Sequence, residues 1–293
     1  MAIIQWYPGH MEKAKREVQS QLSAVDIVIE LRDARVPQSS ENPMINKLIN
    51  QKKHLIVLNK ADLADPKATE QWLKYLKYHQ GAAIAIDSKN NRDMKRLREA
   101  IKALARPIVE KWQQKGVKQK TIRLMVLGIP NVGKSTFINQ LTRKKIASVG
   151  NRPGVTKGQQ WIRIDEDFEL LDTPGILWPK FEDQRVAERL ALIGSIKDDH
   201  YYSDDILLVT LDILKTHYPE AFMAAFKLKE ADMELSLPDL LLLLTKKMGL
   251  KDDYEQASDQ LIQSLQKGKL GRFTFDWISD FEEETDGGSE HDE

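Results

Sequence analysis

Short, almost continuous apolar runs alternate with amphipathic stretches along the first 180 residues of the chain. The apolar runs occupy 25–31, 54–58, 82–86 and 122–128, and they are typical of strands that are buried on both faces. Helical spacing of apolar residues between the runs predicts helices at 10–22, 41–51, 66–79, 92–105 and 134–143. This alternation predicts an α/β fold, a mostly parallel sheet with helices on both faces.

Turn-forming residues refine this pattern. Pro107 is expected to stop the helix that begins at residue 92, because proline lacks the N–H that the helix needs. A polar connector at 111–120 follows. The segments 159–164 and 168–172 lie close together and are predicted to form a hairpin.

The pattern changes after about residue 178, where only helical spacing remains. One predicted helix, 238–250, has proline at its start and glycine at its end, and another covers 254–271. We therefore predict one α/β domain at 1–178 and an all-helical domain at 179–278. An acidic, disordered tail is expected at 279–293.

The formal net charge of zero hides an uneven distribution. Residues 280–293 carry eight acidic residues and no Lys or Arg, so the remainder has 44 basic and 44 − 8 = 36 acidic residues, a net charge of +8. The segment 92–123 is the most basic, with eleven Lys or Arg and three acidic residues. It is either a solvated helix with a linker or a surface that faces RNA phosphates.

Some classes of protein are excluded by composition. The chain has no cysteine, so it has no disulfide framework and no cysteine-based metal site. No apolar run reaches the roughly 18 residues of a membrane span, and the start lacks a secretory or transit pattern. The expected compartment is the cytoplasm.

The segment "GIPNVGKS" at 128–135 matches the phosphate-binding P-loop, with a predicted strand before it and a predicted helix after it. Its backbone N–H groups are expected to surround phosphates, with Lys134 reaching the β- and γ-phosphates and Ser135 binding Mg²⁺. The residues expected to contact nucleotide here are Pro130, Asn131, Val132, Gly133, Lys134, Ser135 and Thr136.

Two further segments suit the phosphate end of such a site. "DTPG" at 172–175 begins 37 residues after Ser135, where Asp172 is expected to bind Mg²⁺ through water and the Gly175 N–H to reach the γ-phosphate. Thr156, in "RPGVTKG", is the candidate for a second hydroxyl on Mg²⁺. Each segment has this meaning only beside the P-loop.

The segment "NKAD" at 59–62 is expected to recognise the base of the nucleotide. The carboxylate of Asp62 can accept the N1 and N2 protons of guanine, which adenine does not offer, and Lys60 can cover the ring with its stem. Asn59 can bind the other edge or tie the loop to the P-loop. The segment "DSK", Asp87, Ser88 and Lys89, follows the next strand, where the Ser88 N–H is expected to donate to guanine O6.

Together these motifs resemble the circularly permuted P-loop GTPases, most closely the ribosome biogenesis GTPase A (RbgA/YlqF) family. The resemblance covers about residues 5–278 and includes "WYPGHMEKAKRE", "DARVPQSSENP" and "DTPGIL". In most chains that carry both motifs, the P-loop precedes NKAD, whereas here the order is reversed. The chain departs from the family pattern "SAK" at Asp87, so we expect the side-chain hydrogen bond of that serine to be lost.

The resemblance implies a Mg²⁺-dependent GTPase that assists late assembly of the large ribosomal subunit and binds ribosomal RNA through its helical domain. That domain is not basic overall, with twelve basic and seventeen acidic residues in 181–275. Binding would need a local patch, or else these are ordinary solvated charges. The candidates for RNA contact are Lys246, Lys247, Lys251, Lys267, Lys269 and Arg272.

Hydrolysis needs a group that orients water, and Ile176, which follows DTPG, cannot hydrogen-bond one. The permutation suggests that the first helix lies beside this segment, which brings forward its leading residue, His10. The alternative is that His10 caps the helix or packs on Tyr7, and the resemblance favours a catalytic role. Asn131 either binds K⁺ between the phosphates or only stabilises the loop.

Three hypotheses follow for function. The first is a K⁺-stimulated GTPase that acts as a switch in ribosome assembly, binding GTP, GDP and the large subunit as a monomer. The second is a non-catalytic RNA-binding scaffold with GTP as a structural ligand. The third is an ATP-using enzyme, against which Asp62 argues.

Overall fold

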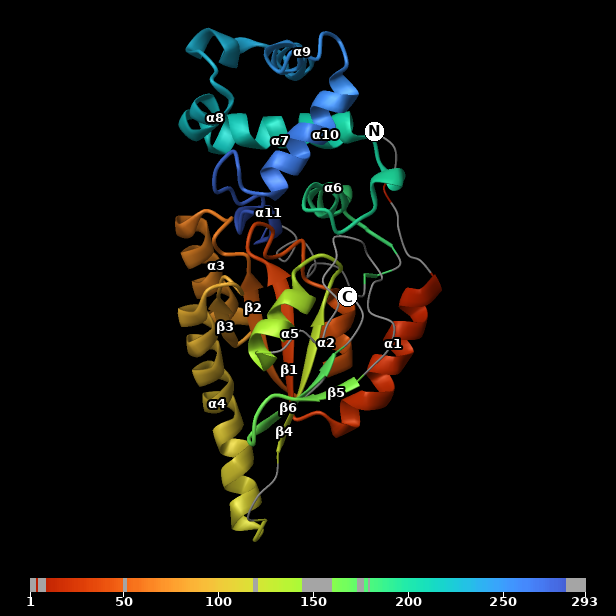
Figure 1. The fold of residues 1–293 in the computed structure, drawn as a ribbon, viewed down its shortest axis with the longest axis vertical. Coiled ribbons are helices and arrows are strands. Elements are labelled where there is room, and N and C mark those ends of the chain that lie inside the picture. The colour runs from red at the N-terminus through yellow and green to blue at the C-terminus, as the bar shows by residue number, and fades with distance from the viewer. Residues whose placement is uncertain are drawn as a thin grey trace, which may run out of the picture. The chain divides into compact units, whose positions relative to one another are not determined.

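Figure 1 shows the fold in the computed structural model of the protein. The structure describes residues 4, 9–49, 52–117, 121–143, 160–172, 177–178 and 180–282. Backbone contacts divide the chain into two compact units. We call Tyr7–Trp178 with Thr274–Glu293 the sheet unit, and Met1–Trp6 with Pro179–Phe273 the helical unit.

The sheet unit is built on six strands in the order β3-β2-β1-β4-β6-β5. Neighbouring strands are parallel except for β5, which pairs antiparallel with β6. The strands are β1 Ile27–Asp33, β2 Lys53–Asn59, β3 Ala82–Ala85, β4 Ile122–Gly128, β5 Gln160–Arg163 and β6 Phe168–Asp172. The predicted hairpin and the mostly parallel sheet are both present.

Three helices cover one face of this sheet: α1 Gly9–Gln21, α2 Pro43–Ile49 and α3 Pro66–His79. Apolar residues of α1 and α2 pack with Val28 of β1 and Met125 of β4, which are register partners. Trp72 and Leu76 of α3 pack with Ile56 and Leu58 of β2. The short helix Leu22–Ala24 connects α1 to β1.

Two helices, α4 Asn91–Gln114 and α5 Lys134–Thr142, belong to the other face, where α5 stands in front of the sheet in Figure 1. Arg98 of α4 donates to the carbonyl of Leu141 in α5 and pairs with Asp165 at 3.0 Å, just after β5. Helices therefore cover both faces, as the alternation of patterns predicts.

The expected stop at Pro107 is wrong, because α4 continues through it to Gln114. A proline inside a helix costs about 3 kcal/mol, so packing must offset this cost. Val109 and Trp112, beyond the proline, line a hollow with Ile122 of β4 and Phe168 of β6. The last turns of α4 therefore face β4 and β6 across this hollow.

The division into units differs from the predicted one at its C-terminal end. Residues 274–278 were predicted in the helical domain, but from Thr274 on the chain belongs to the sheet unit. The cause is a set of buried contacts in that unit, including the hydrogen bond from Phe275 N to Arg35 O at 2.7 Å. The short helix α11 Ser279–Glu282 follows, and the rest of the predicted acidic tail lies outside the described residues.

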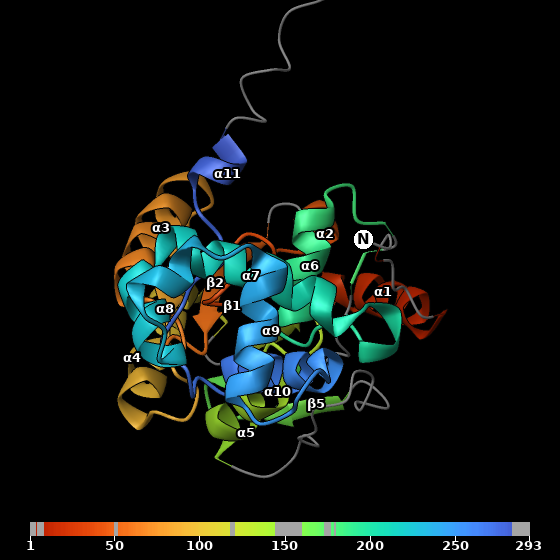
Figure 2. The same ribbon diagram turned by 90° about the horizontal axis from the view of Figure 1, so that it is seen from above.

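The helical unit is built around α7, which packs against α6, α8, α9 and α10. Figure 2 shows α7, α9 and α10 together. The helices are α6 Gln184–Leu192, α7 Ser203–His217, α8 Pro219–Phe226, α9 Leu237–Lys247 and α10 Tyr254–Gln266, with short 3-10 helices at Asp198–His200 and Glu230–Glu234. Asp183, Ser236 and Asp253 cap three of them by accepting backbone N–H groups.

Two helices of this unit are shorter than predicted because glycines end them. Gly249 after α9 and Gly268 after α10 have φ of 76° and 69°, a left-handed conformation that favours glycine. Leu250 N donates to Thr245 O, and Lys269 N to Ser264 O, which closes both helix ends. None of the helices in the described ranges is long and apolar enough to cross a membrane.

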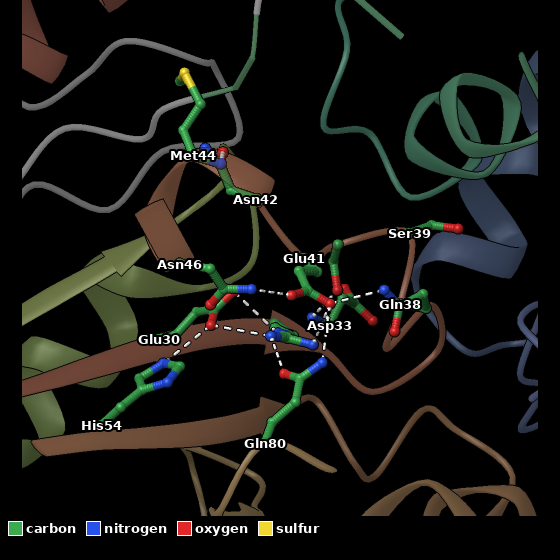
Figure 3. Close-up of polar contacts among 12 residues, drawn as sticks. Glu30, Asp33, Gln38, Ser39, Glu41, Asn42, Met44, Asn46, His54 and Gln80 are labelled. Carbon is green, nitrogen blue, oxygen red and sulfur yellow. Dashed lines mark hydrogen bonds and ion pairs between the residues drawn. The ribbon is translucent and has the colours of Figure 1, made fainter. Parts of the chain in front are cut away.

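The central strand β1 carries three fully buried charged residues, and two of them, Glu30 and Arg32, belong to one network. Arg32 donates to both oxygens of Glu30 at 3.0 Å and to Glu41 at 3.0 Å (Figure 3). Gln80 accepts a further bond from Arg32 at 2.8 Å, and His54 Nε2 lies 3.0 Å from Glu30. One guanidinium therefore joins a strand, a loop and the end of α3.

Removal of this guanidinium is expected to destabilise the sheet unit strongly. Arg32→Met leaves Glu30 and Glu41 buried without their cation, at a cost of about 3–5 kcal/mol. Urea unfolding followed by tryptophan fluorescence measures this, because five of the six tryptophans lie in the sheet unit. The control is Arg96→Met, whose exposed pair with Asp93 contributes less than about 1 kcal/mol. Equal losses in the two variants would contradict the expectation.

The same network predicts a pH dependence. Burial alone would raise the pKa of Glu30, but the charge and hydrogen bonds of Arg32 and His54 together outweigh it and lower the pKa from 4.5 to about 2. A depressed carboxyl pKa stabilises the fold above the unfolded value and loses that effect as pH falls towards the folded value. We expect the advantage of wild type over Glu30→Gln, up to about 3 kcal/mol, to shrink between about pH 5 and pH 2. A difference that does not change with pH would contradict this.

Candidate nucleotide-binding site

The P-loop connects the end of β4 to α5, and two glycines shape it. Gly133 has φ of 95°, and a Cβ atom there would lie 2.5 Å from Asn59 Nδ2. A Cβ atom on Gly128 would lie 2.6 Å from the carbonyl oxygen of Leu31. Only glycine therefore permits this close approach of the P-loop to β1 and to the loop after β2.

The P-loop encloses the side chain of Lys134, which is 9% exposed. Its ammonium group donates to Gly128 O at 3.1 Å and Ile129 O at 3.0 Å. The charge thus lies inside the loop whose N–H groups are expected to bind phosphates. The other predicted P-loop contacts, Pro130 to Thr136, lie on the same loop and the first turn of α5.

The loop after β2, which carries Asn59, is fixed to the P-loop by a hydrogen bond. Asn59 is 2% exposed and donates from Nδ2 to Val132 O at 2.7 Å. Its other side-chain atom, Oδ1, accepts from Ser88 Oγ at 2.6 Å. Asn59 therefore joins the loops after β2, β3 and β4.

The chain has Asp87 where the family pattern "SAK" has serine, but the neighbouring Ser88 makes a side-chain hydrogen bond to this site. Although a serine is absent at position 87, the Ser88 hydroxyl supplies a side-chain bond to Asn59. The Ser88 N–H, predicted to donate to guanine O6, lies 3.3 Å from Asn59 Oδ1 here. Asp87 accepts the N–H of Lys89 at 2.8 Å, and this bond shapes the turn.

Lys60 has a left-handed backbone conformation, with φ of 58°, and its ammonium group makes two contacts. Nζ donates to Asn131 O of the P-loop at 2.6 Å and lies 3.0 Å from Asp33 Oδ2. Burial lowers the pKa of Lys60, which the carboxylate of Asp33 opposes. Asp62, two residues further on, is exposed.

Asp33 is a site residue that we did not single out from the sequence. It is fully buried, and it accepts from Arg35 at 2.8 and 2.9 Å while it pairs with Lys60. Burial would raise its pKa, but Arg35 and Lys60 hold the pKa well below its ordinary value. Its position in the sequence could have indicated this role. Asp33 begins "DAR" at the end of β1, and its register partner in β2 is Asn59, the first residue of NKAD.

Part of a Mg²⁺ site can be described. Ser135 is half-buried at the first turn of α5, beside Lys134, and its hydroxyl is the kind of hard oxygen that Mg²⁺ takes. The described donor therefore fits this cation. Thr156 and Gly175 lie outside the described residues, as do the side chains of His10 and Asp172. Their roles stay predictions.

The six candidate RNA-contact residues are all exposed. They come from the end of α9 and the following turn, and from the segment after α10. A hollow of about 440 Å³ lies between these places, lined by Leu244 and Lys247 of α9, Leu261 of α10 and Leu270. Lys247 also donates to Lys227 O at 2.7 Å and lies 3.6 Å from Asp232, so part of its charge is used internally.

Comparison with known proteins agrees with this site. Residues 123–246 match a family described as "50S ribosome-binding GTPase". That match starts at β4, directly before the P-loop, which is where an unpermuted domain would begin. Ribosome biogenesis GTPase A of Bacillus cereus is 44% identical over 289 residues, which cover 97% of each chain.

More distant relatives agree as well. Ribosome biogenesis GTPase A of Thermotoga maritima is 32% identical over 278 residues, 92% of this chain and 93% of that protein. The crystal structure of GNP-bound YlqF from T. maritima has a TM-score of 0.64 and 26% identity, and it covers 90% of this chain and 97% of that one. The motifs, the strand order and these relatives together show that the chain belongs to the ribosome biogenesis GTPase A family of circularly permuted GTPases.

Proposed function

We propose that this GTPase assists late maturation of the large, 50S ribosomal subunit and changes its hold on the subunit with the state of its nucleotide. The observation that carries the proposal is the joining of NKAD to the P-loop by Asn59, in a chain whose relatives are named for ribosome biogenesis. GTP would order Thr156 and Gly175 and favour the subunit-bound state. We expect a monomer in the cytoplasm, and both stay predictions.

Guanine selectivity is assigned to Asp62. The loop that carries it is held at Lys60 and Asn59, so its carboxylate is offered at a fixed place. A carboxylate there accepts the N1 and N2 protons of guanine, and adenine would leave it unpaired. The ATP-using alternative is therefore disfavoured.

Hydrolysis is assigned to His10 together with charge at the phosphates. α1 begins at Gly9, so the backbone of His10 lies in the first turn of that helix. Leu177 N approaches Met11 Sδ at 3.5 Å, which supports the prediction that the start of α1 lies near the segment after DTPG. In that place His10 would orient the attacking water. When bound, Mg²⁺ would neutralise charge on the phosphates, with Ser135, Thr156 and Asp172 as its protein partners.

The proposal also assigns residues that bind K⁺ and residues that bind RNA. Asn131 has φ of 60°, so its backbone is fixed in an uncommon conformation beside Lys60, and we assign to its side chain a K⁺ ion near the phosphates. Lys246, Lys247, Lys251, Lys267, Lys269 and Arg272 are assigned to RNA phosphates. Their exposure at two neighbouring places of the helical unit supports this.

Asp62→Asn is expected to weaken GTP binding on the order of 10²-fold and to favour xanthosine triphosphate, whose O2 accepts the new amide proton. Competition with a fluorescent nucleotide measures both affinities. Asp65→Asn is the matched control, because it loses the same charge and still caps α3. Unchanged selectivity for GTP in Asp62→Asn would refute the assignment.

Mature 50S subunits are expected to raise single-turnover GTP hydrolysis at least about tenfold. His10→Ala should lower the stimulated rate about 100-fold, the scale of general acid–base effects. His79→Ala, at the last turn of α3, is the control and should leave the rate unchanged. No stimulation of the wild type would favour a scaffold that uses GTP only as a structural ligand.

The same assay tests the monovalent cation. Replacing K⁺ by Na⁺ should slow the wild type, and Asn131→Ala should be slow in either salt. If Asn131→Ala keeps the full response to K⁺, then Asn131 does not hold the ion.

A further inference from the structure

The chain returns to the sheet unit after the last helix of the helical unit, and three consecutive residues make this return. Thr274, Phe275 and Asp276 are 0–2% exposed, although two of them are polar. Buried polar groups are retained only where they are hydrogen-bonded. The partners of this segment, which lies outside the nucleotide motifs, therefore indicate its role.

Asp276 binds the loop that follows β1. Its Oδ2 accepts the N–H groups of Gln38 at 2.8 Å and Ser39 at 2.7 Å, and its Oδ1 accepts the hydroxyl of Ser39 at 2.7 Å. Phe275 N donates to Arg35 O at 2.7 Å. One carboxylate thus satisfies three donors of a single loop in a site closed to water.

The same segment also contacts the neighbouring loop, the one after β2. Thr274 Oγ1 accepts the N–H of Asp65 at 3.2 Å, three residues after Asp62. Trp72 Nε1, in α3, donates to Asp276 O at 3.1 Å. The segment therefore bridges two loops that lie at the carboxyl ends of adjacent strands.

A short chain of contacts leads from Asp276 to the nucleotide site. Ser40, next to Ser39, accepts the N–H of Asp33 on its hydroxyl at 3.0 Å. The carboxylate of Asp33 lies 3.0 Å from Lys60 Nζ, which donates to the P-loop carbonyl of Asn131. Figure 3 shows Gln38 and Ser39 on the loop near Asp33.

We propose that Asp276 is a positioning residue for guanine nucleotide binding. By fixing the loop of Gln38 to Ser40, it fixes Asp33, and Asp33 in turn holds Lys60 over the P-loop. Thr274 supports the same end of the site through Asp65. The segment after the helical unit thus helps to position the residues that bind the base. Loss of its hydrogen bonds lowers the affinity for nucleotide.

This role predicts a specific effect on nucleotide affinity and on kcat. Among the described residues, these contacts lead to the base side of the site and to the P-loop carbonyl of Asn131, which GDP and GTP share. Loss of Asp276 therefore weakens GDP and GTP binding by the same factor and leaves hydrolysis of bound GTP unchanged. This effect needs no ribosomal subunit, so it is independent of the function proposed above.

The test measures dissociation constants of fluorescent GDP and of a non-hydrolysable GTP analogue for the full chain. Asp276→Ala is expected to raise both about tenfold, with kcat at saturating GTP within about twofold of wild type. Asp276→Asn is expected to stay within about threefold of wild type, because its amide oxygen accepts both N–H groups and its NH₂ donates to Ser39. Ser39→Ala, a smaller change, should raise both constants about threefold.

The control separates positioning from stability. Val18→Ala opens a cavity under α1 and destabilises the same unit, and the buried apolar cluster described around Val18 contains no residue of either loop. It should leave both dissociation constants unchanged at a temperature where all variants are folded. Constants that stay unchanged in Asp276→Ala, or that rise only for the GTP analogue, would overturn the proposal. If Asp276→Ala does not fold, an unchanged affinity in Ser39→Ala would overturn it equally.

Discussion

The hydrogen bond from Asn59 to the carbonyl of Val132 is the contact on which the nucleotide site depends. It joins loops that are 73 residues apart and that occur in the reverse of the usual order along the chain. The bond survives this reversal because parallel strands gather all their carboxyl ends at one edge, whatever the order in which the chain visits them. Gly133 is required there, since a side chain at that position would collide with Asn59.

Buried charged residues of β1 stabilise the loops at that edge of the sheet. The face of β1 that would ordinarily be apolar carries Glu30 and Arg32, and Arg32 reaches Glu41 in the loop after the strand. Asp276 also holds this loop, through the N–H of Ser39. An apolar core would be no less stable, but it would not dictate where a polar loop lies, and here directional bonds fix the loop that carries the partner of Lys60.

The sequence was sufficient for the strands, the loops at their ends and the family, because each motif follows a strong apolar run. It was insufficient where tertiary contacts override local preference. Glu30 lies within the run 25–31 that is predicted to be buried, but the burial of Arg32 just after it depends on its pairs with Glu30 and Glu41. α4 continues through Pro107, which local preference does not predict. Asp276 had no local signal, since the partners of its carboxylate are more than 230 residues away. His10, Thr156 and Gly175 stay predictions.

The return of the chain at Thr274 makes the helical unit an insertion rather than an appendage. Its chain leaves the sheet unit after Trp178 and re-enters it at Thr274, so it behaves as a loop with both ends anchored. A closed loop has less conformational entropy when unfolded than a free tail of the same length. The helical unit therefore gains stability from its anchorage, and a minimal catalytic fragment must keep residues 274–282 and bridge the gap instead of ending at residue 178.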